Sequence, residues 1–283
     1  MSRQYIREAE LTIGNLVTAT VITGLRIQFM ITKDLQGFPN LAEISIFNLN
    51  EDTRSKIQNE FENLVLKAGY KDNLKTIFTG DLRNVTKTRI GPDLITTIFA
   101  ADGNKDFNEA FYNKSFNDGS KVTDIITDIV SEFEEVTKGV IEGVNTAAQK
   151  VFGATFSGNS SEVLDQLGDE NEFDWSIQNG KVDIIARDSY VDEQTVITSR
   201  TGMINSPTIT EIGIDVKTLL NPSILPGRLI KVESSAPNFS LGNLNFREIN
   251  KTLGEGVYKV IKIIHNGDTH SNNWDSTITG SQI

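Results

Sequence analysis

Two histidines with an aspartate between them are the residues best placed to do chemistry. His265 and His270 are the only imidazoles in the chain, and Asp268 lies between them. Groups of this kind at short spacing can ligate a metal ion or move a proton. A closed metal site, however, needs three or four ligands held in place by further hydrogen bonds. These three residues fall in a stretch predicted to be a flexible loop, so we expect no metal or acid–base site there.

Other catalytic arrangements are also missing from the sequence. Glu132, Glu134 and Glu135 could supply the paired carboxylates of a glycosidase, but they follow an amphipathic helical pattern, where solvent-facing acids are ordinary. The chain has no cysteine, no G-x-S-x-G motif and no glycine-rich phosphate loop followed by Lys-Ser or Lys-Thr. We therefore predict no catalytic residue, no cofactor or cofactor-binding residue, no metal ligand and no enzymatic activity.

Trp175 and Trp274 could line a sugar-binding surface. Each is a single aromatic residue in a segment that is predicted to be a strand. Isolated strand tryptophans are more often part of a hydrophobic core, because a core buries a large indole efficiently. We interpret both as core residues.

Composition limits the class of protein. A chain of 283 residues fits two or three domains, and no apolar run approaches the roughly 18 residues of a membrane helix. The start, Met1 to Leu11, lacks the apolar region of a secretory signal, so we expect folding in a cytoplasm and no stable membrane association. A net charge of −11 argues against nucleic-acid binding, which depends on clustered cations.

The charge is unevenly distributed and suggests three domains. Residues 1–104 hold 12 acidic and 12 basic residues, residues 105–193 hold 19 and 7, and residues 194–283 hold 7 and 8. An acidic middle is expected when solvated helices are present. We place the domain boundaries at these two shifts.

The first of these regions is predicted to be β-dominated. Leu25 to Lys33 alternates between apolar and polar residues, as a half-buried strand does. Asn50 is placed to cap one short helix, with Glu51 and Asp52 in its first turn. The other predicted strands cover residues 9–17, 41–49, 64–67, 76–88 and 94–101.

The acidic middle region is predicted to be a small α+β domain. Val122 to Phe133 carries the apolar stripe of an amphipathic helix, for which Ser120 is the expected cap. A strand over Val151 to Ser157 precedes a second helix, which should begin at Asn159 and end at Gly168. Asn179-Gly180 predicts a hairpin between two short strands.

The last region returns to strands. They are expected over residues 195–199, 208–216 and 228–234, followed by a closing hairpin of residues 257–264 and 274–279. Residues 235–256 are predicted to form a long loop, which is usually functional or mobile at this length.

Several short motifs occur in an order that is typical of one family. They are LL-x-P-x-x-x-PG at Leu219 to Gly227, G-x-Y-x-V at Gly256 to Val260, H-x-GD at His265 to Asp268, and then Trp274. The N-terminal half adds Ile77-Phe78-Thr79-Gly80. Together they resemble phage tail baseplate hub proteins, which are related to the hub domains of type VI secretion spikes. The likeness covers most of the chain and is weakest at residues 136–149 and 235–253.

The resemblance implies two tube-like β-barrel domains with the small α+β domain between them. It also implies a structural virion protein of a contractile tail, located at the distal end of the tail tube. There a homotrimeric ring would adapt the six-fold tube to a three-fold spike and leave a channel for DNA. Its partners would be the tube protein, the spike protein and other baseplate proteins. The alternative is a carbohydrate-binding or cell-wall-degrading tail-tip protein.

Overall fold

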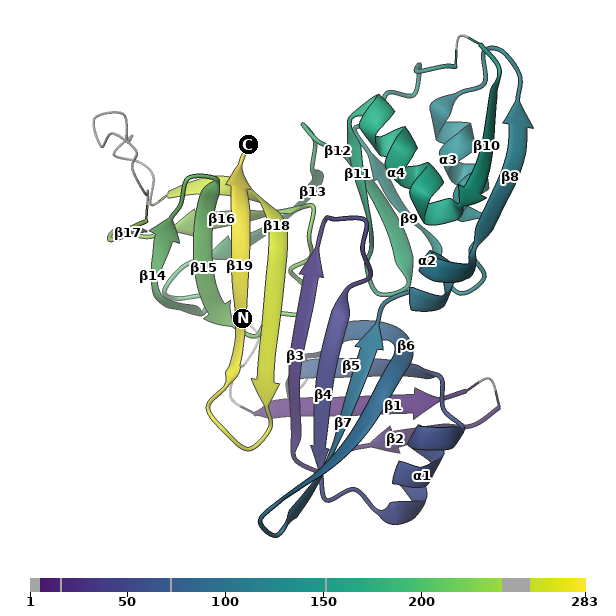
Figure 1. Ribbon diagram of the computed structural model, residues 1–283. Helices are drawn as coiled ribbons and strands as arrows, with labels where there is room; N and C mark the ends of the chain where they lie inside the picture. The colour runs from purple at the N-terminus through teal and green to yellow at the C-terminus, as the bar shows by residue number, and fades with distance from the viewer. Residues whose placement is uncertain (1–5, 16, 72, 151, 241–254) are drawn as a thin grey trace.

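Strands dominate the computed structural model, which describes residues 6–15, 17–71, 73–150, 152–240 and 255–283 (Figure 1). Nineteen strands and four helices are found in these residues, and fourteen of the strands belong to one sheet. The prediction of a β-rich chain is confirmed. None of the described helices is long and apolar enough to cross a membrane.

The N-terminal part of the large sheet is built as the alternating pattern predicts. β3 (Ile27–Asp34) buries every second side chain, including those of Phe29 and Ile31. The helix α1 (Glu51–Asn59) begins at Asn50, whose side chain accepts a hydrogen bond from the backbone N–H of Thr53. The remaining strands are β1 (Arg7–Gly14), β2 (Ala19–Ile22), β4 (Leu41–Phe47), β5 (Asn63–Tyr70), β6 (Asn73–Ile90) and β7 (Asp93–Ala101).

The middle region forms two small sheets covered by helices. β8 (Phe111–Phe116) pairs with β10 (Ala154–Asn159), and β11 (Phe173–Ile177), β12 (Lys181–Ala186) and β9 (Thr137–Glu142) form the second sheet. The helices are α2 (Asn104–Glu109), α3 (Val122–Val130) and α4 (Ser160–Asn171). The apolar stripe of α3 is buried as predicted, because it packs into the core of this region.

Two helix ends of the middle region differ from the prediction. Ser120 does not cap α3: Lys121 occupies that position without a side-chain bond, and the Ser120 hydroxyl donates to the carbonyl of Asn117. α4 does start at Asn159 but passes through Gly168 and ends at Asn171. A Cβ at Gly168 would lie 2.7 Å from the carbonyl oxygen of Phe173, so this glycine permits close packing and does not end the helix.

The C-terminal part of the sheet contains one misplaced strand boundary. The single strand predicted over residues 208–216 is wrong, because the chain turns at residues 210–212 and forms the hairpin of β14 (Met203–Ile209) and β15 (Gly213–Leu219). The other strands are β13 (Val191–Ile197), β16 (Arg228–Glu233), β17 (Asn238–Phe239), β18 (Glu255–Asp268) and β19 (Trp274–Gln282). Most of the loop predicted over residues 235–256 lies outside the described residues.

β18 joins the N-terminal and C-terminal parts into one sheet. One edge of β18 pairs with β19. The opposite edge pairs with β16 over its first half and with β3 over its second half. The strand order of the described residues ends at β2 on one side and at β17 on the other, so no closed barrel is found.

Buried apolar side chains gather in separate clusters. The largest three lie in the N-terminal β part, in the middle region and in the C-terminal β part. Leu220 and Trp274 of the C-terminal part belong to the N-terminal cluster, which shows that the two β parts share some of their core.

Candidate functional site

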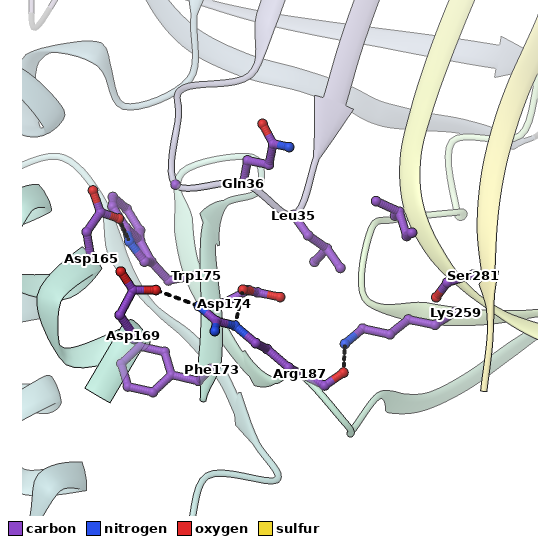
Figure 2. A pocket seen from close by; sticks show the side chains of 13 residues that line it. Leu35, Gln36, Asp165, Asp169, Phe173, Asp174, Trp175, Arg187, Lys259 and Ser281 are labelled. Atoms are coloured by element: carbon purple, nitrogen blue, oxygen red, sulfur yellow. Dashed lines mark hydrogen bonds and ion pairs between the residues drawn. The ribbon is translucent and has the colours of Figure 1, made fainter. Parts of the chain in front are cut away.

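A cavity of about 550 Å³ lies where the three regions meet (Figure 2). Leu35, Gln36 and Gly37 reach it from the connection between β3 and β4. Trp175 lines it from β11, and Lys259 lines it from β18. We call this space the junction cavity.

The charged groups that line the junction cavity have partners within the fold. Arg187 contacts Asp169 at 2.7 Å and Asp174 at 3.1 Å, and the indole N–H of Trp175 donates to Asp165 at 2.7 Å (Figure 2). Burial lowers the pKa of Lys259, whose Nζ donates to the backbone carbonyls of Ala186 and Arg187. These contacts hold the elements around the cavity together.

A polar interlock around the buried side chains of Lys33 and Asp102 lies at the Asn179-Gly180 turn. Both residues have positive φ, 55° and 76°, as a tight hairpin requires. Their backbone N–H groups donate to the Asp102 carboxylate at 2.5 and 2.8 Å, and Lys33 Nζ donates to Asn179 Oδ1 at 2.5 Å. Burial raises the pKa of Asp102 to about 6 and lowers the pKa of Lys33 to about 8. The sequence predicted the hairpin, but it did not predict that the turn lies between the charged groups of Lys33 and Asp102.

Three further contacts fix the middle region to the β parts. The Asn40 amide donates to the Ile177 carbonyl at 2.5 Å, and the Gln178 amide donates to the Asp34 carbonyl at 2.8 Å. On the C-terminal side, the buried Arg228 guanidinium forms an ion pair with the buried Asp183. Buried ion pairs need such close partners, since an unpaired charge in the interior is costly.

The structure separates the two histidines of the opening motif. The prediction that they lie on a flexible loop is wrong for His265, because β18 continues to Asp268. His265 is buried, and its Nδ1 lies 2.8 Å from the Ser276 hydroxyl. Burial, together with the nearby charge of Lys33, lowers the pKa of His265 to about 3. His270 is exposed, and the described residues contain no group of three His, Cys, Asp or Glu side chains that could hold a metal ion.

Asp268 is the anchor of the β18–β19 hairpin. It accepts hydrogen bonds from Arg26 at 2.7 and 3.2 Å, from Gln28 at 2.8 Å and from the backbone N–H of His270 at 2.9 Å. Burial favours the neutral form, but these donors outweigh it and hold the pKa of Asp268 well below its usual range. The carboxylate therefore binds the loop to β3 and its flanking residues.

The remaining motif residues also lie in the contact between the β18–β19 hairpin and β3. The rings of Phe29 and Trp274 meet edge to face, with centroids 5.5 Å apart and planes at 70°. A Cβ at Gly267 would lie 2.1 Å from the Phe29 ring, so only glycine fits there. The H-x-GD motif and Trp274 thus seat the closing hairpin on β3, a role that the sequence alone did not reveal.

The other candidate residues have structural partners. Glu132 pairs with Lys114 at 3.1 Å, while Glu134 and Glu135 each lie 3.4 Å from Lys105. Trp175 and Trp274 are 3% and 1% exposed, which confirms the interpretation of both as core residues.

The fold is that of phage tail proteins. The structure of a 43 kDa tail protein from prophage MuSo2 of Shewanella oneidensis matches with 10% identity, a TM-score of 0.64, and 98% of this chain and 97% of that chain covered. A tail protein from Neisseria meningitidis MC58 matches with 7% identity, a TM-score of 0.63 and the same coverage. The E. coli c3393 protein, a type VI secretion component, matches with 8% identity, a TM-score of 0.59, and 96% and 76% covered. At these identities the likeness shows the fold alone.

The family is shown by sequence. The model of the family "Baseplate hub gp41" matches residues 8–246, and the chain belongs to this family. It is a structural protein of the phage tail baseplate. No curated protein matches the chain at a significant level.

Proposed function

We propose that three copies of this hub protein form a ring at the distal end of the tail tube. The ring adapts a six-fold tube to a three-fold spike. The observation that carries the proposal is the continuous sheet through β18, which joins an N-terminal and a C-terminal β part within one chain. Three copies then present six β parts, and each interface joins the first β part of one copy to the last of the next.

The division of the chain supports this arrangement. We assign residues 1–104 and 194–283 to two tube-like β domains and residues 105–193 to the acidic domain between them. In Figure 1 the middle region lies to one side of the large sheet, which suits a position outside the ring. Barrel closure would come from neighbouring copies, because the open strand edges of one chain are the natural sites for added strands.

The ring would leave a channel for DNA without binding it specifically. A net charge of −11 offers phosphates little attraction, so DNA would pass without being retained. Filter binding of duplex DNA at low salt tests this point. Retention at micromolar protein would contradict it.

The partners that fit this position are the tube protein, a spike protein and other baseplate proteins. The type VI secretion component among the similar folds supports a spike partner. We place the protein in the virion of a contractile tail after assembly in the host cytoplasm.

We also propose that the protein is not an enzyme, because the charged groups of the junction cavity form contacts that hold the fold together. The rival role as a carbohydrate-binding or cell-wall-degrading tail-tip protein gains no support from Trp175 and Trp274, since both indoles are buried. Incubation with peptidoglycan and chromogenic glycosides tests this proposal. Turnover that is lost on Glu132→Ala or His265→Ala would contradict it.

The stoichiometry tests the proposed ring. Native mass spectrometry of the protein mixed with its tube and spike proteins should give complexes with three copies of this chain. Complexes that hold one copy or six copies would contradict the proposal.

A further inference from the structure

A basic arm extends from the N-terminal β part. β6 is 18 residues long, and its pairing with β5 ends at Asp81, so its far end pairs with β7 alone. Residues 86–92 at the tip are all exposed, including Ile90 at 63%. Arg83, Lys87 and Arg89 are exposed, and within the described part of the chain none of them forms an ion pair. We call residues 83–92 the arm.

An acidic groove lies elsewhere on the same β part. It is a cavity of about 490 Å³ between the sheet and the connection that leads to β9. Its floor consists of Thr12, Val65 and Thr79, which are neighbours across β1, β5 and β6. Its wall carries Glu134 and Glu135, and Glu134 has a side chain that is 77% exposed.

The charge of the groove is incompletely balanced. Asp81 lies beside Glu134 and Glu135 among the lining residues, and Lys105 contacts both glutamates at 3.4 Å. The Asp81 carboxylate accepts a hydrogen bond from the backbone N–H of Lys105 at 2.8 Å. Burial raises its pKa to about 6, and the Glu135 carboxylate adds to the rise. Three carboxylates around one ammonium group favour a cationic partner.

The groove borders an open strand edge. Ala19 of β2 lines the groove, and β2 is the last strand at its end of the sheet. No charged residue occurs between Glu10 and Arg26, and Val21 is 57% exposed. Two other edge strands of the large sheet are protected: β13 carries Asp192, Glu193 and a register shift, and β17 has only two residues. An uncharged free edge without such protection is expected to be covered by another strand.

We propose that, in addition to the interface between the first β part of one copy and the last of the next, the arm of one copy docks in the groove and along the β2 edge of the neighbouring copy. The tip of the arm points away from α2 and the middle region, whereas the groove lies beside them, so the contact cannot form within one chain (Figure 1). A repeated contact between two different surfaces generates a ring or a filament. The strand edge and Ile90 supply the buried surface. Lys87 and Arg89 oppose the glutamates and fix the orientation, which is the usual contribution of rim charges.

This inference rests on the proposed function because it requires several copies in one assembly. The lack of cysteine allows a direct test, since the double variant Arg89→Cys with Glu134→Cys carries the only thiols. Treatment of tails assembled from this variant with a short bismaleimide should give covalent dimers and trimers on a denaturing gel. Each single variant should stay monomeric, as should the control pair Lys121→Cys with Glu134→Cys, which lies entirely outside the arm.

Charge reversal provides the second test. Lys87→Glu with Arg89→Glu, or Glu134→Lys with Glu135→Lys, should each weaken trimer formation about tenfold, and the combined variant should recover most of the loss. A ring that forms equally well in both reversals, without crosslinks, would overturn the arm contact and leave the trimer intact. Crosslinks to a different tail protein would overturn the assignment to a second copy. Absence of any trimer in the unaltered protein would instead overturn the proposed function.

Discussion

Lys33 Nζ donates to Asn179 Oδ1 at 2.5 Å, although the two residues are 146 positions apart. The contact places the tip of the β11–β12 hairpin against the N-terminal β part. Asp102 completes it by accepting both backbone N–H groups of the turn. The hub therefore holds its middle region through a buried interlock and not through apolar packing alone.

Asp102→Ala should destabilise the protein by about 3–5 kcal/mol, because it leaves the buried Lys33 ammonium without a nearby opposite charge and the backbone N–H groups of Asn179 and Gly180 without their acceptor. Urea unfolding monitored by circular dichroism measures the loss. The control is Asp192→Ala, which changes an exposed carboxylate and should cost less than about 0.5 kcal/mol. Equal effects of the two substitutions would contradict the interlock.

Lys33→Met should remove a rise in stability at alkaline pH. Burial lowers the pKa of Lys33 from 10.5 to about 8, so above pH 8 the unfolded state binds more protons than the folded state. Stability then rises between about pH 8 and pH 10.5, by up to about 3 kcal/mol. The unfolding midpoint at several pH values measures this rise. It should persist in the exposed variant Lys121→Met, and its persistence in Lys33→Met would assign it to another group.

Asp268→Ala should cost about 2–3 kcal/mol and release the β18–β19 hairpin, because Arg26 and Gln28 lose their shared acceptor. Hydrogen exchange at residues 269–273 should accelerate. His270→Ala removes a neighbouring exposed ring and should change exchange little. Unaltered protection in Asp268→Ala would show that the carboxylate does not anchor the loop.

Gly267→Ala should cost about 1–3 kcal/mol, since the added methyl group collides with the Phe29 ring and forces it against Trp274. The same change in a Phe29→Ala background should cost clearly less, because the collision is gone. A double-mutant cycle of unfolding free energies measures this coupling. Additive effects would exclude the collision as the cause.

Features that depend on neighbouring residues were predicted well from the sequence. Asn50 and Asn159 begin their helices because an Asn side chain caps the first free N–H groups. Asn179-Gly180 forms its turn because both residues tolerate positive φ. The apolar stripe of α3 is buried because its spacing matches the helical period.

Features that depend on distant residues were not predictable in the same way. Asp268 was predicted to be a loop residue. Its carboxylate is held by a hydrogen bond from Arg26, which is 242 positions away in the sequence. Gly168 was predicted to end a helix, but a glycine is needed there because the backbone of Phe173 packs closely against it. The turn between β14 and β15 was not predicted, because residues 210–212, Thr-Glu-Ile, contain no Gly, Pro or Asn. The residues of β18 likewise do not indicate that this strand pairs with β16 in one part of the sheet and with β3 in the other.

The central claim is best tested by a cryo-electron microscopy reconstruction of assembled tails. The account predicts three copies of this chain in a ring between the tube and the spike, with six β parts around a channel and the middle regions outside. A ring of six copies, or a single copy at the periphery of the baseplate, would contradict it.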